Sequence, residues 1–181
     1  DKSISDSGKK SISIFGDAFS HETKYKVAET IRNELDKLDL LIYSIASRKR
    51  IDPDSNEEYT SVIKPINEKF SFKTLDINKS KIYESSLEAA TDEEVSQTIK
   101  VMGGEDWKLW NEILKDEDVL AENFKTVAYS YIGPEFTYPI YRNGTLGEAK
   151  KDLEKTANEI TDMIKEYNGK AYVSINKALI T

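Results

Sequence analysis

The sequence predicts an α/β fold of the Rossmann-like kind, in which a mostly parallel sheet is flanked by helices. Two observations support this prediction. Apolar runs of strand length alternate with stretches of helical periodicity, and residues 38–46 form one nearly continuous apolar run. Such a run is typical of a parallel strand covered on both faces. Parallel strands need crossover connections, so the alternation favours right-handed βαβ units.

The first strand and helix are expected near the start of the chain. Residues 11–15 alternate polar and apolar side chains, which predicts a short strand. A helix should follow over residues 22–35, with Ser20 as a candidate N-cap and apolar residues on one stripe. The apolar run 38–46 then supplies the next strand.

The middle of the chain, residues 47–123, is expected to be an inserted loop, hairpin and pair of helices. Residues 47–69 are polar and predict a long loop. Two strands are predicted near residues 70–75 and 82–87, and they should pair as a β-hairpin. This small β-hairpin and the helices that follow it are expected to form an insertion in the sheet domain. The capping-box pattern that begins at Thr91 predicts the first of the two helices.

The strand and helix alternation resumes in the last third of the chain. Residues 124–132 predict a strand, and residues 133–144 predict a loop. A long helix should begin at Thr145 and end near residue 168, and residues 170–175 predict the last strand.

Residues 1–181 are expected to form part of a larger Rossmann-like reductase domain. A dinucleotide-binding sheet usually carries a glycine-rich turn after its first strand, and no G-x-G-x-x-G pattern occurs in the sequence. The chain also ends shortly after a predicted strand. We therefore expect that it is cut from a longer protein at both ends.

Composition excludes several classes of function. The chain has 26 Lys and Arg against 33 Asp and Glu, a net charge of −7, which argues against a nucleic-acid partner. No run of about 18 apolar residues predicts a membrane span. The absence of cysteine and the single histidine exclude disulfides, a cysteine nucleophile and a multi-histidine metal site. No signal peptide is visible, so a cytoplasmic location is expected.

Tyr141 and Lys150 form the first candidate pair for chemistry. Lys150 lies on or beside the apolar stripe of the helix that begins at Thr145, where a lysine needs a partner or a path to water. A nearby ammonium lowers the pKa of a phenol from about 10 and makes it a better proton donor. From the pattern alone, a loop tyrosine and a lysine that extends to water are the more common alternative.

Further candidates lie where predicted strands end, because ligands of parallel α/β sheets bind at the carboxyl ends of the strands. Tyr129 and Tyr131 share one face of their strand. Core packing is the favoured interpretation for Tyr129, and Tyr131 is left open.

Small or acidic residues follow two other predicted strands. Asp17-Ala18 and Ile45-Ala46 could let a flat ring approach the backbone, and an aspartate could accept from an adenine amino group. Ordinary turn chemistry is the alternative for both pairs.

Other conspicuous residues have structural interpretations. His21 is expected in the first turn of a helix, and Trp107 and Trp110 are expected in the core. Arg48 is interpreted as part of a solvated loop, although it could meet a coenzyme phosphate.

Six segments and one residue spacing carry a resemblance to a known family. Tyr141 and Lys150 are separated by eight residues. The segments are residues 16–20, 39–47, 61–65, 101–107, 128–135 and 137–142. With this spacing, they resemble the trans-2-enoyl-CoA reductase family, which includes the long-chain-type NADH-dependent enoyl-acyl-carrier-protein reductases.

The resemblance implies an enzyme of fatty acid biosynthesis and lipid metabolism. It implies NADH-dependent reduction of the C2=C3 double bond of trans-2-enoyl thioesters, carried by coenzyme A or by acyl carrier protein, in a monomer. Tyr141 would be the proton donor, Lys150 the NAD-binding lysine and Tyr131 a substrate contact. The further NAD contacts implied are Asp17, Ala18, Ile45, Ala46, Leu179, Ile180 and Thr181.

Two alternatives stay open. A 3-ketoacyl reductase of the related superfamily could use the same tyrosine and lysine on a carbonyl group. The chain could also be an inactive fragment that only binds acyl-CoA or NAD, because the family's glycine-rich loop and its cofactor-selecting acidic residue would precede Asp1.

Overall fold

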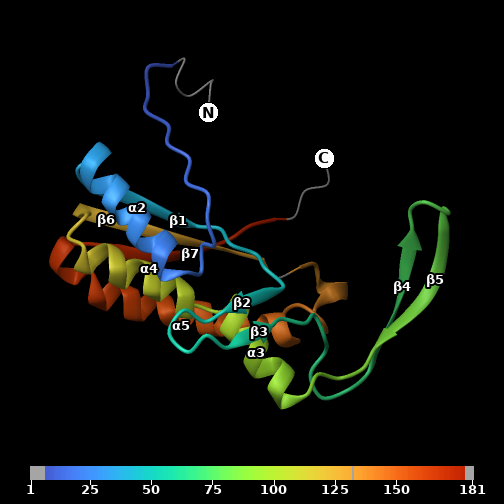
Figure 1. The fold of residues 1–181 in the computed structure, drawn as a ribbon. Helices are drawn as coiled ribbons and strands as arrows, with labels where there is room; N and C mark the ends of the chain where they lie inside the picture. Colours follow the sequence, from blue (N-terminus) through green and yellow to red (C-terminus); the bar gives the residue numbers. More distant parts are fainter. Residues whose placement is uncertain (1–6, 132, 178–181) are drawn as a thin grey trace.

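The computed structural model describes residues 7–131 and 133–177, and a parallel sheet of β1, β6 and β7 lies at its centre (Figure 1). Helices α4 and α5 pack on one face of the sheet, and α2 packs against α4. The elements in chain order are α2 (His21–Glu34), β1 (Leu38–Tyr43), β2 (Lys49–Ile51), β3 (Glu58–Thr60), β4 (Phe70–Asp76), β5 (Lys81–Leu87), α3 (Asp92–Met102), α4 (Glu105–Asp116), β6 (Leu120–Ser130), η1 (Glu135–Thr137), α5 (Thr145–Met163), η2 (Lys165–Tyr167) and β7 (Lys170–Ile175).

The predicted α/β class and parallel sheet are confirmed. β6 is the central strand and pairs in parallel with β1 on one side and with β7 on the other. Its residues Phe124, Thr126, Ala128 and Ser130 alternate inward and are buried against the helices. The carboxyl ends of the three strands therefore meet at one edge of the sheet.

The prediction that the first long apolar run is covered on both faces is wrong for the described residues. Leu40 and Ile42 on β1 are 48% and 49% exposed, and Tyr172 on β7 is 48% exposed. These residues lie on the face opposite α4 and α5. Apolar sequence indicates that a strand can be buried on both sides, but burial depends on a covering element, and none of the described helices lies on this face.

The predicted strand at residues 11–15 is also wrong. This segment runs as a coil away from the sheet, and Phe15 is 90% exposed. Alternation sets which way side chains point, but a strand forms only when a neighbouring backbone pairs with it. The described sheet edges pair with no part of this segment.

The predicted long loop at residues 47–69 contains two short strands, β2 and β3, which pair antiparallel. Strands of three residues are too short to give an alternating pattern, so the sequence could not indicate them. Arg50 on β2 is 2% exposed and donates to Glu105 Oε2 at 2.6 Å, which ties this pair to α4.

The predicted hairpin is confirmed as β4 and β5, which pair from Phe70 with Leu87 to Asp76 with Lys81. Figure 1 shows it projecting from the rest of the molecule. The strand β6 begins at Leu120, four residues before its predicted start.

The helix boundaries follow from local chemistry, as predicted. Ser20 Oγ accepts from the Thr23 amide at the start of α2. Thr91 and Glu94 form the complete capping box of α3. The helix α5 ends at Met163, five residues before its predicted end, and the 3-10 helix η2 follows it. Asn168 ends η2 in a left-handed conformation with φ 51° before β7 begins.

Trp107 and Trp110 lie in the core as predicted, at 0% and 8% exposure. Trp107 Nε1 donates to Thr126 Oγ1 at 2.8 Å and so fixes α4 on β6. Among the residues that the structure describes, no helix is both long and apolar enough to cross a membrane.

Candidate functional site

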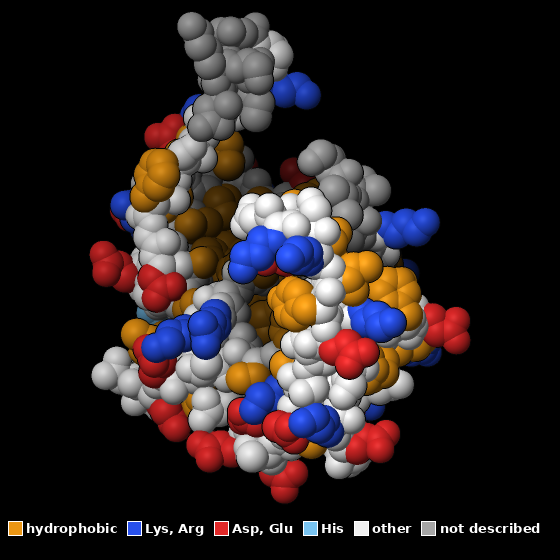
Figure 2. Space-filling view, turned by 90° about the vertical axis from the view of Figure 1, so that its right-hand side faces the viewer, with side chains coloured by type: hydrophobic (Ala, Val, Ile, Leu, Met, Phe, Trp, Pro, Cys, Tyr) orange, Lys and Arg blue, Asp and Glu red, His pale blue; other side chains and the backbone are white. Residues whose placement is uncertain are grey.

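A cavity of about 390 Å³ opens at the carboxyl edge of the sheet. Figure 2, viewed toward that edge, shows hydrophobic side chains gathered in a hollow with basic side chains near its rim. Each strand contributes the residues that follow or end it, and α5 contributes Lys150. The residues that the argument uses are Ile45, Ala46, Tyr129, Ser130, Tyr131 and Lys150.

A second cavity of about 300 Å³ lies beside the first and shares Tyr131 and Lys150 with it. Tyr141 lines this second cavity. The rings of Tyr131 and Tyr141 meet edge to face, with centroids 5.4 Å apart and planes at 88°. The fold thus brings together Tyr131, Tyr141 and Lys150, for which the family resemblance predicts the roles of substrate contact, proton donor and cofactor lysine.

Lys150 carries an unusual charge environment for a lysine. Burial lowers its pKa, because removal from water disfavours the ammonium. It makes no hydrogen bond or ion pair with any residue in the described ranges. A half-buried ammonium without a protein partner is well suited to a ligand that brings its own oxygen atoms.

The loop before α5 sets the position of Tyr141. The Tyr141 amide donates a hydrogen bond to Thr137 O at 3.0 Å. Gly133 has φ 73°, which favours glycine, and a β-carbon there would lie 2.5 Å from Thr137 Oγ1 and 3.4 Å from the Tyr141 ring. The close approach of Gly133 therefore shapes the loop around the phenol.

The start of α5 is anchored by a segment far away in the sequence. Thr145 Oγ1 donates to Val62 O at 2.5 Å, and the Thr145 amide donates to Lys64 O at 3.0 Å. Gly147 lies one turn before Lys150, and a β-carbon there would overlap the backbone carbonyl of Arg142. Sequence reasoning missed Gly147. A glycine inside a predicted helix was the only signal for it.

Two residues at the end of β6 differ from expectation or were missed. Tyr129 is 46% exposed and lines the first cavity, so its predicted core position is wrong. The reason is that it points to the uncovered face of the sheet. Ser130 points the other way, is 5% exposed, and its Oγ has no hydrogen-bond partner among the described residues. Nothing in the sequence pattern distinguished it from other strand serines.

The remaining predicted cofactor contacts fall in three places. Ile45 and Ala46 line the first cavity. Asp17 and Ala18 lie in the turn before α2, outside the residues that line the two cavities, with Asp17 exposed. The contacts predicted at Leu179, Ile180 and Thr181 lie outside the described residues.

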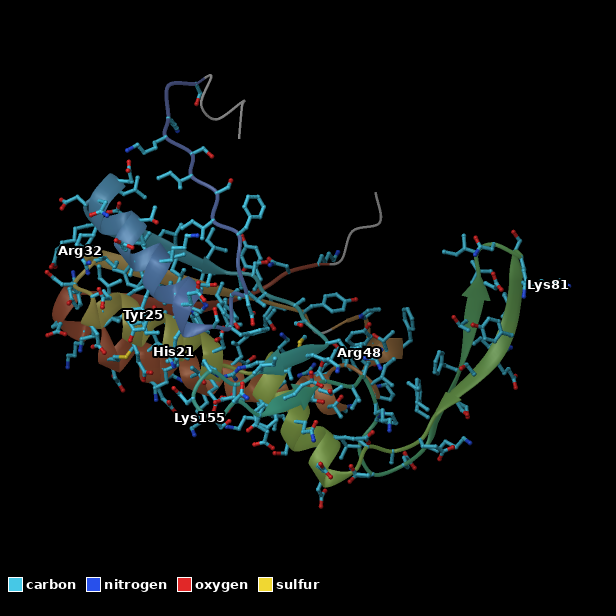
Figure 3. All side chains as sticks on the ribbon, viewed as in Figure 1. His21, Tyr25, Arg32, Arg48, Lys81 and Lys155 are labelled. Carbon is cyan, nitrogen blue, oxygen red and sulfur yellow. The ribbon has the colours of Figure 1, made fainter. Side chains whose placement is uncertain are left out.

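Arg48 and His21 occupy different surroundings (Figure 3). Arg48 lines a third cavity of about 580 Å³, together with Leu87 at the base of the hairpin and with Met102. His21 lies in the first turn of α2, as predicted, and its Nε2 is 2.7 Å from Asp54 Oδ1.

Comparison with known proteins is consistent across sequence and structure. A curated trans-2-enoyl-CoA reductase (NADH) of Clostridium perfringens is 54% identical over 180 residues, which are 99% of this chain and 46% of that protein. An enoyl-acyl-carrier-protein reductase (NADH) of Teredinibacter turnerae is 51% identical over 166 residues, or 92% of this chain and 42% of that protein.

A solved structure of a similarly named reductase also resembles this chain closely. The crystal structure of Clostridium acetobutulicum trans-2-enoyl-CoA reductase in complex with NADH has a TM-score of 0.95 and 44% identity, covering 99% of this chain and 46% of that chain. The present chain thus spans about half the length of the curated relatives it matches. The family model described as the trans-2-enoyl-CoA reductase catalytic region matches residues 1–181, and the chain therefore belongs to the trans-2-enoyl-CoA reductase family.

Proposed function

We propose that the complete protein containing this chain reduces the C2=C3 double bond of trans-2-enoyl thioesters with NADH. The observation that carries the proposal is the convergence of Tyr131, Tyr141 and Lys150 on adjoining cavities at the carboxyl edge of the sheet. The names of relatives support it, since one is named for enoyl-CoA, another for enoyl-acyl-carrier-protein, and both for NADH.

The residues at this edge fit part of a dinucleotide. Ala46 offers only a methyl group at the cavity wall, which leaves room for a flat ring beside the backbone. Lys150 lacks a partner within the described ranges, and ribose hydroxyls would supply the hydrogen bonds that its ammonium lacks. Ile45 contributes apolar surface to the same cavity, as small-molecule sites usually require.

Each residue has a distinct role in the proposed reaction. NADH, when bound, supplies the hydride that reduces the β-carbon. Negative charge then develops on the thioester oxygen, to which the Tyr141 phenol donates a hydrogen bond and its proton. The resulting enol tautomerises to the saturated thioester, so that a proton ends on the α-carbon, and solvent restores the phenol. Tyr131 meets the Tyr141 ring edge to face and contacts the substrate beside it. Lys150 holds the ribose and adds positive potential beside the developing charge.

We also propose a monomeric, cytoplasmic enzyme of fatty acid metabolism, with coenzyme A or acyl carrier protein as the acyl carrier. The net charge of −7 supports the absence of a nucleic-acid partner. Gel filtration of the complete protein tests the monomer.

The test is loss of NADH absorbance when the complete protein is given crotonyl-CoA. We expect rapid loss with crotonyl-CoA and with a crotonyl carrier protein, and slow loss with acetoacetyl-CoA. Faster turnover of acetoacetyl-CoA would make the enzyme a ketoreductase and overturn the proposal. Binding of NADH without turnover of any of the three substrates would reduce it to a binding protein.

A further inference from the structure

A buried ion pair lies beneath the turn that precedes α2. Lys24 is 0% exposed, and its Nζ lies 2.8 Å from Oδ1 of Asp106, which is 2% exposed. The ring of Trp110 lies 5.3 Å from the same Nζ. A buried ion pair is weak evidence for stability, because desolvation of two charges offsets much of their attraction. Stabilisation of the core is therefore not a sufficient explanation for this pair.

Lys24 fixes the backbone of the turn formed by residues 17–19. Its Nζ donates to Ala18 O at 3.1 Å and to Phe19 O at 2.6 Å. Trp110 Nε1 donates to the same Ala18 O at 3.1 Å. Two side chains from different helices thus hold two successive carbonyls, and both point inward.

The same turn presents its acidic side chain to solvent. Asp17 Oδ1 accepts from the Phe19 amide at 3.0 Å, which closes the turn locally. The other carboxylate oxygen of Asp17 makes no hydrogen bond within the described ranges and lies on an exposed residue. The turn is therefore held by hydrogen bonds on its buried side, while the Asp17 carboxylate faces solvent on the other side.

The network continues from the turn to the sheet. Tyr43 donates through its hydroxyl to Asp106 Oδ2 at 3.0 Å. Tyr43 is the last residue of β1, and Ile45 and Ala46, which line the first cavity, follow two and three residues later. One chain of contacts thus connects the turn at residues 17–19 with the carboxyl end of β1.

We propose that Lys24, Asp106 and Tyr43 are positioning residues that hold the Asp17–Ala18 turn and the β1 carboxyl end in fixed relation for one extended dinucleotide. The inference rests on the proposed function. The family resemblance predicts both segments as cofactor contacts. Ile45 and Ala46 line the first cavity, whereas Asp17 and Ala18 lie outside it, so a ligand that meets both segments extends beyond that cavity. A network that fixes their spacing before binding lowers the entropic cost of binding. None of the three residues touches the ligand in this proposal.

The experiment uses the complete protein and the variant Lys24→Met, which keeps much of the side-chain volume and removes both donors to the turn. We expect the Kd for NADH, measured by fluorescence titration, to rise about tenfold, equivalent to about 1.4 kcal/mol. KM for NADH should rise in parallel while kcat changes little, because the reacting groups are elsewhere. Hydrogen exchange at the Phe19 and Ser20 amides should become faster.

Leu114→Ala is the matched control for lost stability. Leu114 lies on α4, is 0% exposed, and belongs to the core without bonding to the turn. This variant should lower Tm and leave the Kd for NADH unchanged. Trp110→Phe removes a single donor to Ala18 O, so its Kd should rise less than that of Lys24→Met, and it also tests the inference if Lys24→Met fails to fold.

The outcomes separate the inference from the proposed function. Failure of the wild-type protein to bind NADH would overturn both. Wild-type binding together with an unchanged Kd in Lys24→Met and Trp110→Phe would overturn the inference alone. An equal rise in Kd for Leu114→Ala would show that any loss of core stability weakens binding, which also contradicts a specific positioning role.

Discussion

At the scale of single residues, the site combines a phenol, an ammonium and a second phenol. The ring contact between Tyr131 and Tyr141 fixes one pair, and Lys150 lines both adjoining cavities. The chemistry proposed for Tyr141 depends on its hydroxyl alone, because its ring packing would survive loss of the oxygen atom.

Replacement of Tyr141 by Phe tests that dependence in the complete protein. We expect turnover of crotonyl-CoA to fall by about 10²- to 10⁴-fold, the usual contribution of a positioned general acid. The Kd for NADH should stay close to the wild-type value. Tyr138→Phe is the control, because Tyr138 stacks on Arg142 with its ring, and should retain turnover. Near-normal turnover of Tyr141→Phe would exclude the phenol as proton donor.

Replacement of Lys150 by Met separates stability from binding. Burial lowers the pKa of Lys150 below its unfolded value, so the unfolded chain binds more protons between the two pKa values. The charged lysine thus costs stability at neutral pH, and the cost disappears as pH rises through that window. Lys150→Met should have a higher Tm than the wild type at pH 7, and this increase in Tm should be smaller near pH 10. The variant should also bind NADH weakly.

Lys151→Met is the control for this pH dependence. Lys151 is exposed and pairs with Glu148 at 2.7 Å, so its removal should give no rise in Tm at pH 7. Thermal melts at both pH values and NADH titrations measure the effects. A Lys150→Met variant that is less stable than wild type at pH 7 would contradict the assigned cost of burial.

At the scale of elements, the start of α5 positions the chemistry. The helix begins where the segment at residues 62–64 holds Thr145, and Gly147 lets the preceding loop pack closely over its first turn. Sequence distance hides this arrangement, because Val62 and Thr145 are 83 residues apart.

Gly147→Ala tests the close approach of loop and helix. The added methyl group overlaps the Arg142 carbonyl and must displace the loop that carries Tyr141. We expect turnover to fall by at least about tenfold, since small displacements of reacting groups are costly. Tm should fall as well. Ala149→Gly on the same helix is the control for helix stability, and it should lower Tm with a smaller effect on turnover. Unchanged turnover in Gly147→Ala would show that the loop adapts without moving the phenol.

At the scale of the whole molecule, the sheet has one covered and one open face. α4 and α5 bury the inward residues of β6, while Leu40, Ile42 and Tyr172 lie half-exposed on the other side. Exposed apolar area of this kind usually marks a surface that another part of a protein or a ligand covers.

The double variant Leu40→Lys, Ile42→Lys tests the open face in the 181-residue chain. The wild-type chain should bind the dye ANS strongly, and the variant should bind it less with little change in Tm, because both side chains already reach water. Ile113→Lys is the comparison, since Ile113 is 5% exposed and its replacement should unfold the chain. Unfolding of the double variant would show that the face is covered.

The sequence alone determined what depends on neighbouring residues. The capping chemistry at Ser20 and Thr91, the hairpin and the long amphipathic helix α5 follow from short-range patterns, so they could be predicted. Tyr141 and Lys150 are also close in the sequence, since Tyr141 lies in the loop before α5 and Lys150 lies on α5. The contact of Tyr141 with Tyr131 depends in addition on the close approach of the loop at Gly133, which the local pattern does not indicate.

Only the tertiary structure decided what depends on contacts between distant segments. The coil at residues 11–15 has strand-like alternation but does not pair with β1, β6 or β7 in the part of the chain that the structure describes. Tyr129 points outward because no described helix covers that face, and Gly147 matters because the Arg142 carbonyl lies against it. Pairing, burial and close approach are properties of two surfaces at once, whereas a local sequence pattern specifies only one of them.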